Sequence, residues 1–568
     1  ATSIARKPSI AVTSVSVLFE ILFAKNKQNT SYLKQLVSCY QETADFNKAE
    51  NLLKKQLVNY PFQTYLHVDI GYNYDKQQQN EAAKKEYEKA LNSIEKNAAF
   101  GSYIARLFKD NALLDYAILA YQKTMQKNPN VDYNFQIAQI YGEQGETEKM
   151  FQSYIDLLDT NDNYLNNVQR FTSKYITDDA ESNNNLLFKK IVIKKSISNP
   201  KNVWNQLLSW LFSQQKEYGK ALIQEKALYA RDPKYLINIM RLGIISFESK
   251  EYETSKKCFD FVSEKTAILS YKLNAAIYSL KIAVATKTEN IDAQFQQVFE
   301  EFGINYRTLQ IQILYADFLT FQQKNPQKAI IVLTKSLQLV RSKYNTATIK
   351  LKLGDIYVFT GKFNKALVYF SQVQTSIKNH PLAQKARFKV AQTSYFKNDF
   401  KWASAQLKVL KSSTTQLIAN DALELFLVIS GNQPKDSLPT GLHLYAKADL
   451  LSFQQKNERA IEVLQQVVTN FKGQSIEDDA LYKQASLFEK TNQFKKAIQN
   501  YEQLILQFND GIWIDDSLYK LAKIYQQKLN NTEKASEYYQ KIIFEHPSSI
   551  YLVDARKQYR ILRGDTIN

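Results

Sequence analysis

The sequence predicts an all-α protein, a right-handed α-solenoid of about 14 helix pairs with a C-terminal capping helix. Residues that break helices are scarce, because only 14 Gly and 10 Pro occur among 568 residues, against roughly 7% and 5% in average proteins. The hydrophobic share of 44% is too high for a disordered chain and sufficient for a continuous core. Small and aromatic residues also recur at a fixed interval, which is typical of a repeat architecture.

The interval is 34 residues in the first part of the chain. Aromatic residues occupy one repeat position, at Tyr40, Tyr74 and Phe108, and alanines occupy another, at Ala49, Ala83 and Ala117. A small residue lets two helices approach closely. Each helix pair leaves an apolar face that only the next pair covers, so the pairs are expected to stack.

The spacing of the alanines divides the chain into segments. From Ala329 to Ala366 and on to Ala403 the interval lengthens to 37 residues. Two wider gaps, Met150 to Ala221 and Ser255 to Ala329, predict degenerate pairs near 163–198 and 269–303. The predicted segments are an N-terminal helix or lead-in (1–29), a solenoid of 34-residue period (30–303), a basic segment (304–412), an extra helix and Pro/Gly loop forming a bend (413–441, with Pro434 and Pro439), and C-terminal units with a capping helix (442–568).

One unit carries a recognisable motif. Its Ile70-Gly71, Tyr74, Ala83, Tyr87 and Ala90 follow the aromatic, small and apolar template of a tetratricopeptide repeat, with His67 at the usual Trp position. The chain therefore resembles the tetratricopeptide repeat family over nearly its whole length. The resemblance implies a protein-interaction scaffold whose ligands lie in a groove lined by the first helix of each unit.

The last units resemble one branch of that family. They contain DDALYKQA from Asp478, DDSLYKLA from Asp515 and a closing PSSIYLVDAR from Pro547. These motifs are similar to those of bacterial outer-membrane-type tetratricopeptide proteins. That resemblance implies a periplasmic subunit, peripheral to the outer membrane, of a complex for assembly, secretion or transport.

The sequence offers no catalytic or metal-binding motif. None of the four histidines has a second ligand at helical spacing, and HExxH, GxSxG and GxxxxGK[ST] are absent. The acidic pairs Asp478-Asp479 and Asp515-Asp516 are interpreted as helix starts that complement the helix dipole. Cys39 and Cys258 are expected to be buried thiols. The prediction is a protein that is not an enzyme and that needs no cofactor or metal.

Two sets of residues are candidate partner sites. The first is an apolar and aromatic set on predicted first helices, which suits a partner helix or extended peptide, although superhelical packing that buries several of its members in the core is an open alternative. This candidate partner groove consists of Trp210, Met240, Ile244, Phe247, Phe318, Phe321, Phe388 and Tyr395.

The second set is basic. Residues 301–411 contain 18 Lys and Arg but 4 Asp and Glu, a net charge of +14 out of +18 for the whole chain. Such a concentration favours an acidic protein or an anionic membrane surface, while lysines that merely solvate helix exteriors are the alternative. This candidate basic docking patch consists of Lys350, Lys352, Lys362, Lys365, Lys385, Arg387, Lys389, Lys397, Lys401, Lys408 and Lys411.

Three functions remain open from sequence. The first is a noncatalytic scaffold in the periplasm, the second a cytoplasmic adaptor of the same fold, and the third a helical-repeat RNA-binding protein. Repeat proteins that recognise one RNA base per unit need polar side chains at a fixed position in successive units. That position here alternates among Trp210, Ile244, Phe318 and Asp355, so nucleic acid is the least favoured partner.

Overall fold

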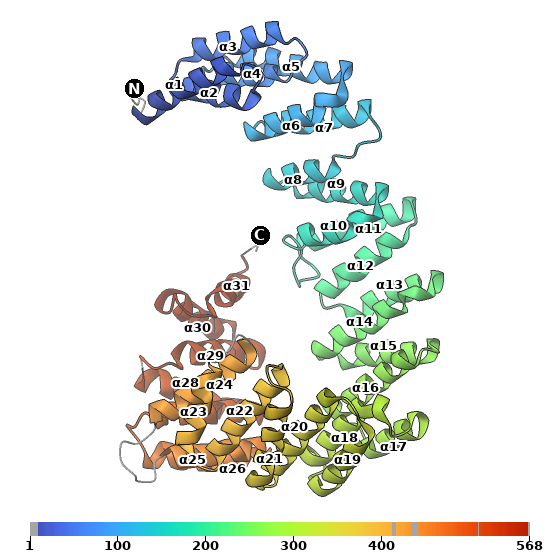
Figure 1. Cartoon of the computed structure of the whole chain (residues 1–568), viewed down its shortest axis with the longest axis vertical. Helices are drawn as coiled ribbons and strands as arrows, with labels where there is room; N and C mark the ends of the chain where they lie inside the picture. Colours follow the sequence, from blue (N-terminus) through green and yellow to red (C-terminus); the bar gives the residue numbers. More distant parts are fainter. Residues whose placement is uncertain (1–9, 412–415, 433–440, 509, 566–568) are drawn as a thin grey trace. The chain divides into compact units, whose positions relative to one another are not determined.

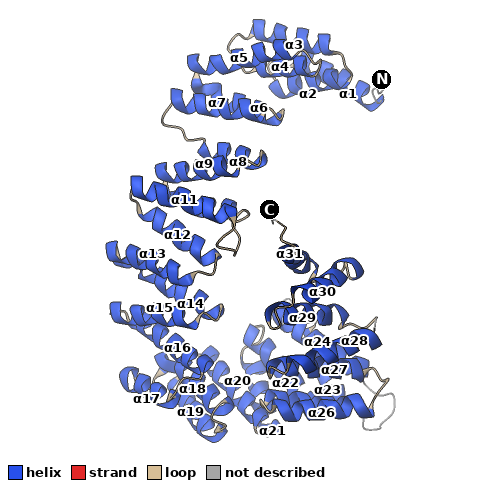
Figure 2. Cartoon of the chain, turned by 180° about the vertical axis from the view of Figure 1, so that it is seen from behind, coloured by secondary structure: helices blue, strands red, loops and turns tan. Residues whose placement is uncertain are grey.

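The computed structural model describes residues 10–411, 416–432, 441–508 and 510–565 (Figure 1). Within these ranges the chain forms 31 α-helices and four short 3-10 helices and contains no strand (Figure 2). None of the described helices is long and apolar enough to cross a membrane. The prediction of an all-α fold is confirmed.

The packing divides the chain into an N-terminal unit, up to residue 258, and a C-terminal unit from residue 259. Most of the described helices can be grouped along the chain into fourteen successive pairs, in agreement with the predicted number of about fourteen. The first seven pairs are α2 (Thr30–Glu42) and α3 (Phe46–Asn59), α4 (Leu66–Asp75) and α5 (Asn80–Lys96), α6 (Gly101–Asp110) and α7 (Leu114–Lys127), α8 (Asn134–Glu143) and α9 (Thr147–Thr160), α10 (Leu165–Thr172) and α11 (Asn183–Ser198), α12 (Asn202–Gln214) and α13 (Tyr218–Arg231), and α14 (Leu236–Glu248) and α15 (Tyr252–Lys265). The division falls within α15.

The remaining pairs are α16 (Leu269–Thr286) and α17 (Ile291–Phe302), α18 (Leu309–Phe321) and α19 (Pro326–Leu339), α20 (Lys343–Phe359) and α21 (Phe363–Ser376), α22 (Pro381–Phe396) and α23 (Phe400–Leu410), α25 (Gly441–Phe453) and α26 (Asn457–Asn470), α27 (Ile476–Lys490) and α28 (Phe494–Gln507), and α29 (Ile514–Gln527) and α30 (Thr532–Glu545). Three helices stand outside the pairs: α1 (Ile10–Lys25), α24 (Gln416–Asn432) and α31 (Leu552–Leu562). The helix α31 packs on α30, in the place of the predicted capping helix.

Tight pairing depends on the small residues of the repeat. A Cβ atom added at Gly354 of α20 would lie 2.2 Å from the Phe370 ring of α21, and one at Gly71 of α4 would lie 2.4 Å from the Tyr87 ring of α5. Only glycine therefore admits these two rings. The alanines Ala83 and Ala366 are fully buried beside them, as the repeat pattern predicts.

The turn inside many pairs uses one residue in the left-handed conformation. The backbone angle φ of this residue is near +61° at Ala44 and Gln78, +64° at Lys250 and +66° at Asn398. Each of these residues lies two positions before the second helix of its pair begins. This conformation favours glycine, yet glycine fills it in few turns, among them Gly361. The positions of glycines in the sequence therefore do not reveal most of these turns.

The acidic pairs of the last units join neighbouring repeats. The Asp479 Oδ1 accepts a hydrogen bond of 2.8 Å from the Trp513 indole, and the Asp516 Oδ1 accepts one of 2.7 Å from the Tyr551 hydroxyl. The rings of Trp513 and Tyr551 also stack on Tyr482 and Tyr519, both at 4.2 Å between centroids. The interpretation of Asp479 as a helix-dipole charge was therefore incomplete, because its carboxylate is buried and bonds the next unit.

The extra helix, α24, is not a member of a helix pair. It packs on α23 and also contacts α22, α25 and α27. At its end, the Asn432 amide donates a 2.6 Å hydrogen bond to Asp479 of α27. The loop with Pro434 and Pro439 lies outside the described residues, so the bend there stays a prediction, as do the segment boundaries at 303, 412 and 441.

Candidate functional site

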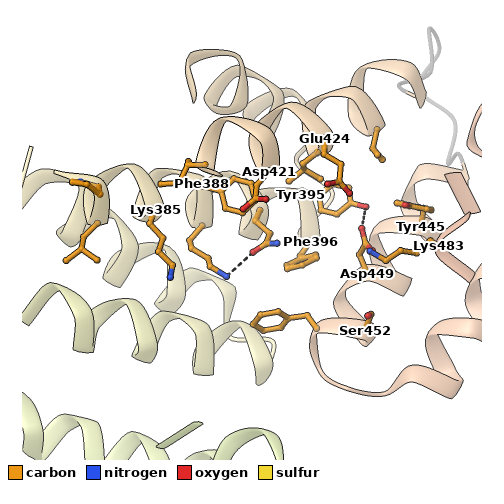
Figure 3. Close-up of a pocket in the computed structure, with 18 residues that line it drawn as sticks. Lys385, Phe388, Tyr395, Phe396, Asp421, Glu424, Tyr445, Asp449, Ser452 and Lys483 are labelled. Carbon is orange, nitrogen blue, oxygen red and sulfur yellow. Dashed lines mark hydrogen bonds and ion pairs between the residues drawn. The ribbon is translucent and has the colours of Figure 1, made fainter. Parts of the chain in front are cut away.

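A cavity of about 790 Å³ opens among α22, α24, α25 and α27 of the C-terminal unit (Figure 3). We call it the α24 pocket. Among the first helices of successive pairs, α22 contacts α25 and α25 contacts α27, and α24 lies against all three. The pocket is lined by Pro381, Leu382, Lys385, Phe388, Lys389, Gln392, Tyr395, Phe396, Ile418, Asp421, Glu424, Leu425, Val428, Tyr445, Asp449, Ser452, Phe453 and Lys483.

One wall of the pocket is aromatic. The rings of Phe396 and Phe453 lie 6.1 Å apart, and Phe453 also meets Phe321 of α18 at 6.0 Å in an edge-to-face arrangement. The ammonium of Lys389 lies 5.5 Å from the centre of the Phe453 ring. Offset and edge-to-face contacts of this kind stabilise a fixed ring orientation, so this wall is held in place before any ligand arrives.

A buried network crosses the floor of the pocket. The Tyr395 hydroxyl donates a 2.9 Å hydrogen bond to Asp449 Oδ2, and Lys483 Nζ lies 2.8 Å from Asp449 Oδ1. Burial raises the pKa of Tyr395 well above its ordinary value, and the nearby Asp449 charge adds to the shift. The pKa of Lys483 is raised chiefly by attraction to Asp449. At neutral pH the side chain of Tyr395 is therefore neutral and that of Lys483 is charged.

Ion pairs of the same kind join other first helices. Lys352 of α20 lies 2.6 Å from Asp317 of α18, and Lys389 of α22 lies 3.2 Å from Asp355 of α20. An aspartate in one unit thus meets a lysine in the next. The series is interrupted between α22 and α25, where the corresponding residues are Gln392 and Ala446 and where the α24 pocket opens.

The wall that α24 contributes is acidic. Asp421 and Glu424 both remain exposed on its pocket side. Within the described ranges neither carboxylate forms a hydrogen bond or an ion pair. Burial raises the pKa of Glu424, Lys483 opposes that shift, and the charges of Asp421, Asp449 and Asp516 add to it.

Comparison with protein-family models finds tetratricopeptide repeats at residues 65–97, 479–510 and 516–549. These segments coincide with α4–α5, α27–α28 and α29–α30. The chain contains tetratricopeptide repeats. No curated protein matches its sequence closely enough to count as a relative. The resemblance to the bacterial outer-membrane branch has no support among these matches.

Comparison with solved structures finds many helical-repeat chains. One is described as "Structure of Naa15/Naa10 bound to HypK-THB", with 12% identity over 94% of this chain and 94% of that one and a TM-score of 0.26. Another is described as "Crystal structure of APC/C hetero-tetramer Cut9-Hcn1", with 13% identity over 97% and 93% and a TM-score of 0.24. Scores this low carry no argument about a site.

The repeats bring only two residues of the predicted groove into the α24 pocket, Phe388 and Tyr395. Phe321 lies next to that pocket, against Phe453. Met240 and Phe318 are buried. Trp210, Ile244 and Phe247 are half-buried on α12 and α14 of the N-terminal unit.

Phe318 belongs to the core, where its ring stacks on Phe295 at 5.6 Å. Phe318→Ser is therefore expected to destabilise the C-terminal unit by about 3 kcal/mol, because it leaves a cavity and buries a hydroxyl. Urea unfolding followed by circular dichroism measures this loss. The half-buried Ile244→Ser is the comparison, with an expected loss of about 1 kcal/mol, and equal losses would contradict the difference in burial.

The structure divides the predicted basic docking patch into three groups. Lys352 and Lys389 form the ion pairs already described, and Lys385 lies on the rim of the α24 pocket. A second group is at or near the turns within the pairs α20–α21 and α22–α23, where Lys362, Lys365 and Lys397 surround a shallow hollow. The others are distributed over the helices: Lys401 and Lys408 exposed, Lys350 and Arg387 half-buried, and Lys411 against the Phe426 ring at 3.9 Å.

A smaller cavity, of about 190 Å³, lies among α2, α4 and α6 of the N-terminal unit and contains Asp69. Burial raises the pKa of Asp69 to about 7, the charge of Lys34 opposes that shift, and the charge of Asp110 adds to it. Lys34 itself lies 3.1 Å from Asp110. Asp69 is therefore a carboxyl group that gains a proton on folding near neutral pH.

Replacing Asp69 by Asn is expected to stabilise the N-terminal unit at alkaline pH. Because the folded pKa is above the unfolded one, stability is greatest below about pH 4 and falls as the pH rises to about 7. Asp69→Asn removes this loss, a gain of about 2 kcal/mol at pH 8 and a smaller gain at pH 5. Urea unfolding at both pH values checks it, and equal gains at the two would refute the assignment.

Several pocket residues were not predicted from sequence: Asp421, Glu424, Tyr445, Asp449, Phe453 and Lys483. A signal did exist for one pair, because Asp449 and Lys483 are 34 residues apart, as are Asp355 and Lys389. No such signal places Asp421 or Glu424, since the extra helix belongs to no repeat.

Proposed function

We propose that this chain is a noncatalytic scaffold that binds a segment of a partner protein in the α24 pocket. The observation that carries the proposal is the pocket itself, which has about 790 Å³ of space with aromatic and aliphatic walls on the surface of three first helices. A partner helix or extended peptide buries apolar side chains in such a groove. Helical-repeat proteins use extended surfaces of stacked units for this purpose.

Site-specific photo-crosslinking tests this function. A photoreactive phenylalanine analogue at Phe388, which lines the pocket, is expected to crosslink one partner in native extracts. The same analogue at Phe544 of α30, which is 70% exposed and does not line the pocket, should not. Identification of the crosslinked peptide by mass spectrometry gives the partner and its segment. Equal crosslinking at both positions, or none at Phe388, would refute capture at this pocket.

Exposed lysines outside the pocket are proposed to attract acidic regions of the same partner. Lys362, Lys365 and Lys397 supply positive charge around one hollow, and none of them belongs to an ion pair within the described ranges. Reversing these three to Glu is expected to weaken partner binding and its dependence on salt. Binding to anionic vesicles in place of a protein would support the membrane alternative, and salt-sensitive RNA binding the nucleic-acid alternative.

The compartment belongs to the same proposal. The resemblance of the DDALYKQA and DDSLYKLA motifs to outer-membrane-type repeat proteins supports a periplasmic subunit of an outer-membrane-associated complex. Cell fractionation tests it, with release by osmotic shock or co-purification with outer membranes as the expected result. Recovery in the cytoplasmic fraction would favour the adaptor alternative.

A further inference from the structure

The α24 pocket holds two carboxylates, of Asp421 and Glu424, that form no hydrogen bond or ion pair with any residue of the described ranges. Asp421 and Glu424 are three residues apart on α24, so both carboxylates lie on one helix face. Two lysines of the lining are engaged elsewhere, since Lys483 pairs with Asp449 at 2.8 Å and Lys389 with Asp355 at 3.2 Å. The third, Lys385, also lines the pocket and forms no ion pair within the described ranges. No lysine of the lining therefore forms an ion pair with either carboxylate of this wall, although Lys483 is near enough to oppose the pKa shift of Glu424.

A second, independent feature is the hydroxyl group of Tyr445 on α25. This side chain lines the pocket and is only 5% exposed. Its hydroxyl makes no hydrogen bond to any residue in the described part of the chain, whereas the neighbouring Tyr395 hydroxyl is bonded to Asp449. The hydroxyl oxygen itself keeps some exposure to the pocket. A ligand that brings a hydrogen-bonding group into the pocket finds this hydroxyl group without a protein partner in the described ranges.

The rest of the lining suits the aliphatic part of a long side chain. Leu425 and Val428 continue along α24 from the acidic pair, and Phe388 of α22 also lines the pocket. Methylene groups can pack on these residues while a charged end remains at the carboxylates. A planar guanidinium has five N–H donors and stacks on aromatic rings, so it meets carboxylates, a hydroxyl and aromatic rings better than an ammonium does.

We propose that the α24 pocket binds an arginine side chain carried by the partner segment, with Asp421 and Glu424 as its carboxylate partners and Tyr445 as a further hydrogen-bonding group. This inference rests on the proposed function, which needs only that a protein segment enters the pocket. It adds the chemistry of the residue that is recognised.

A displayed peptide library tests the proposal on the full chain. Random dodecapeptides are selected on the unaltered protein, and the best are synthesised with a fluorescent label and titrated by anisotropy. We expect one arginine to be common to the selected peptides. Its replacement by citrulline, which removes the charge and keeps the shape, should weaken binding at least about tenfold.

Variants of the pocket complete the test. Asp421→Asn with Glu424→Gln should weaken the arginine peptides at least about tenfold, and Tyr445→Phe several-fold. The matched control is Glu462→Gln with Glu545→Gln, which removes two exposed carboxylates outside the pocket lining and should leave binding unchanged. Circular dichroism verifies that each variant is folded.

The outcomes separate the two proposals. Peptides that respond to Phe388→Ala but carry lysine, neutral or acidic residues in place of arginine would overturn the arginine assignment alone. Arginine peptides indifferent to the Asp421 and Glu424 changes would do the same. A selection without enrichment, or one whose peptides ignore every pocket variant, would overturn the proposed function as well.

Discussion

Gly354→Val is expected to destabilise the C-terminal unit by about 3 kcal/mol. The Phe370 ring lies where the new side chain must go, with its Cε1 atom 2.2 Å from the position of an added Cβ, and this ring is fully buried. The helices α20 and α21 must therefore separate or the ring must leave its rotamer. Urea unfolding monitored by circular dichroism measures the loss.

Two controls belong to this prediction. Gly219→Ala, at a helical glycine with nothing within 4 Å of an added Cβ, should stabilise the N-terminal unit by about 0.5 kcal/mol through helix propensity. Combining Gly354→Val with Phe370→Leu should cost less than the sum of the single changes, because the smaller side chain makes room. Additive losses would show that the ring contact is not the cause.

Asp449→Leu is expected to cost about 2 kcal/mol. The change removes the acceptor of the buried Tyr395 hydroxyl and the ionic partner of Lys483 at the same time. Lys483 keeps 35% of its side chain exposed, which limits the loss to less than that of a fully buried charge. Unfolding in urea gives the difference in stability.

The compensating variant is Asp449→Leu with Lys483→Met, which removes both charges and should recover more than half of the loss. Glu253→Gln is the matched control, because it breaks an exposed ion pair with Lys257 and should leave the midpoint of urea unfolding nearly unchanged. If Asp449→Leu proves as mild as this control, the floor of the pocket is not a structural network.

The sequence predicts the repeat architecture well for a physical reason. Close helix packing requires small residues opposite large ones, so Gly71 with Tyr87 and Gly354 with Phe370 appear at constant spacing. Burial is predicted less well, because Phe318 and Phe321 lie on one helix and differ in environment. The two rings are three positions apart on this helix, and the position of the neighbouring unit decides which of them enters the core.

The candidate site is predicted only in part. Phe388 and Tyr395 are repeat residues and could be placed on a first helix, whereas Asp421 and Glu424 lie on an extra helix whose position depends on tertiary contacts. Net charge marks a lysine-rich segment, of which Lys385 and Lys389 line the α24 pocket, but it does not show which lysines are paired. The excess of lysines in residues 301–411 says nothing about pairing, and Lys352 and Lys389 form ion pairs with single aspartates of neighbouring units.

The position of α24 also bears on how the chain unfolds. In a repeat protein each unit contacts its neighbours only, and stretches of units can open independently. Here α24 contacts α22 and α27 and thereby joins a pair to one that lies beyond the next pair along the chain. We therefore expect the helices from α22 to α28 to unfold as a single cooperative block, whose amide hydrogens exchange together with solvent while the units elsewhere open locally.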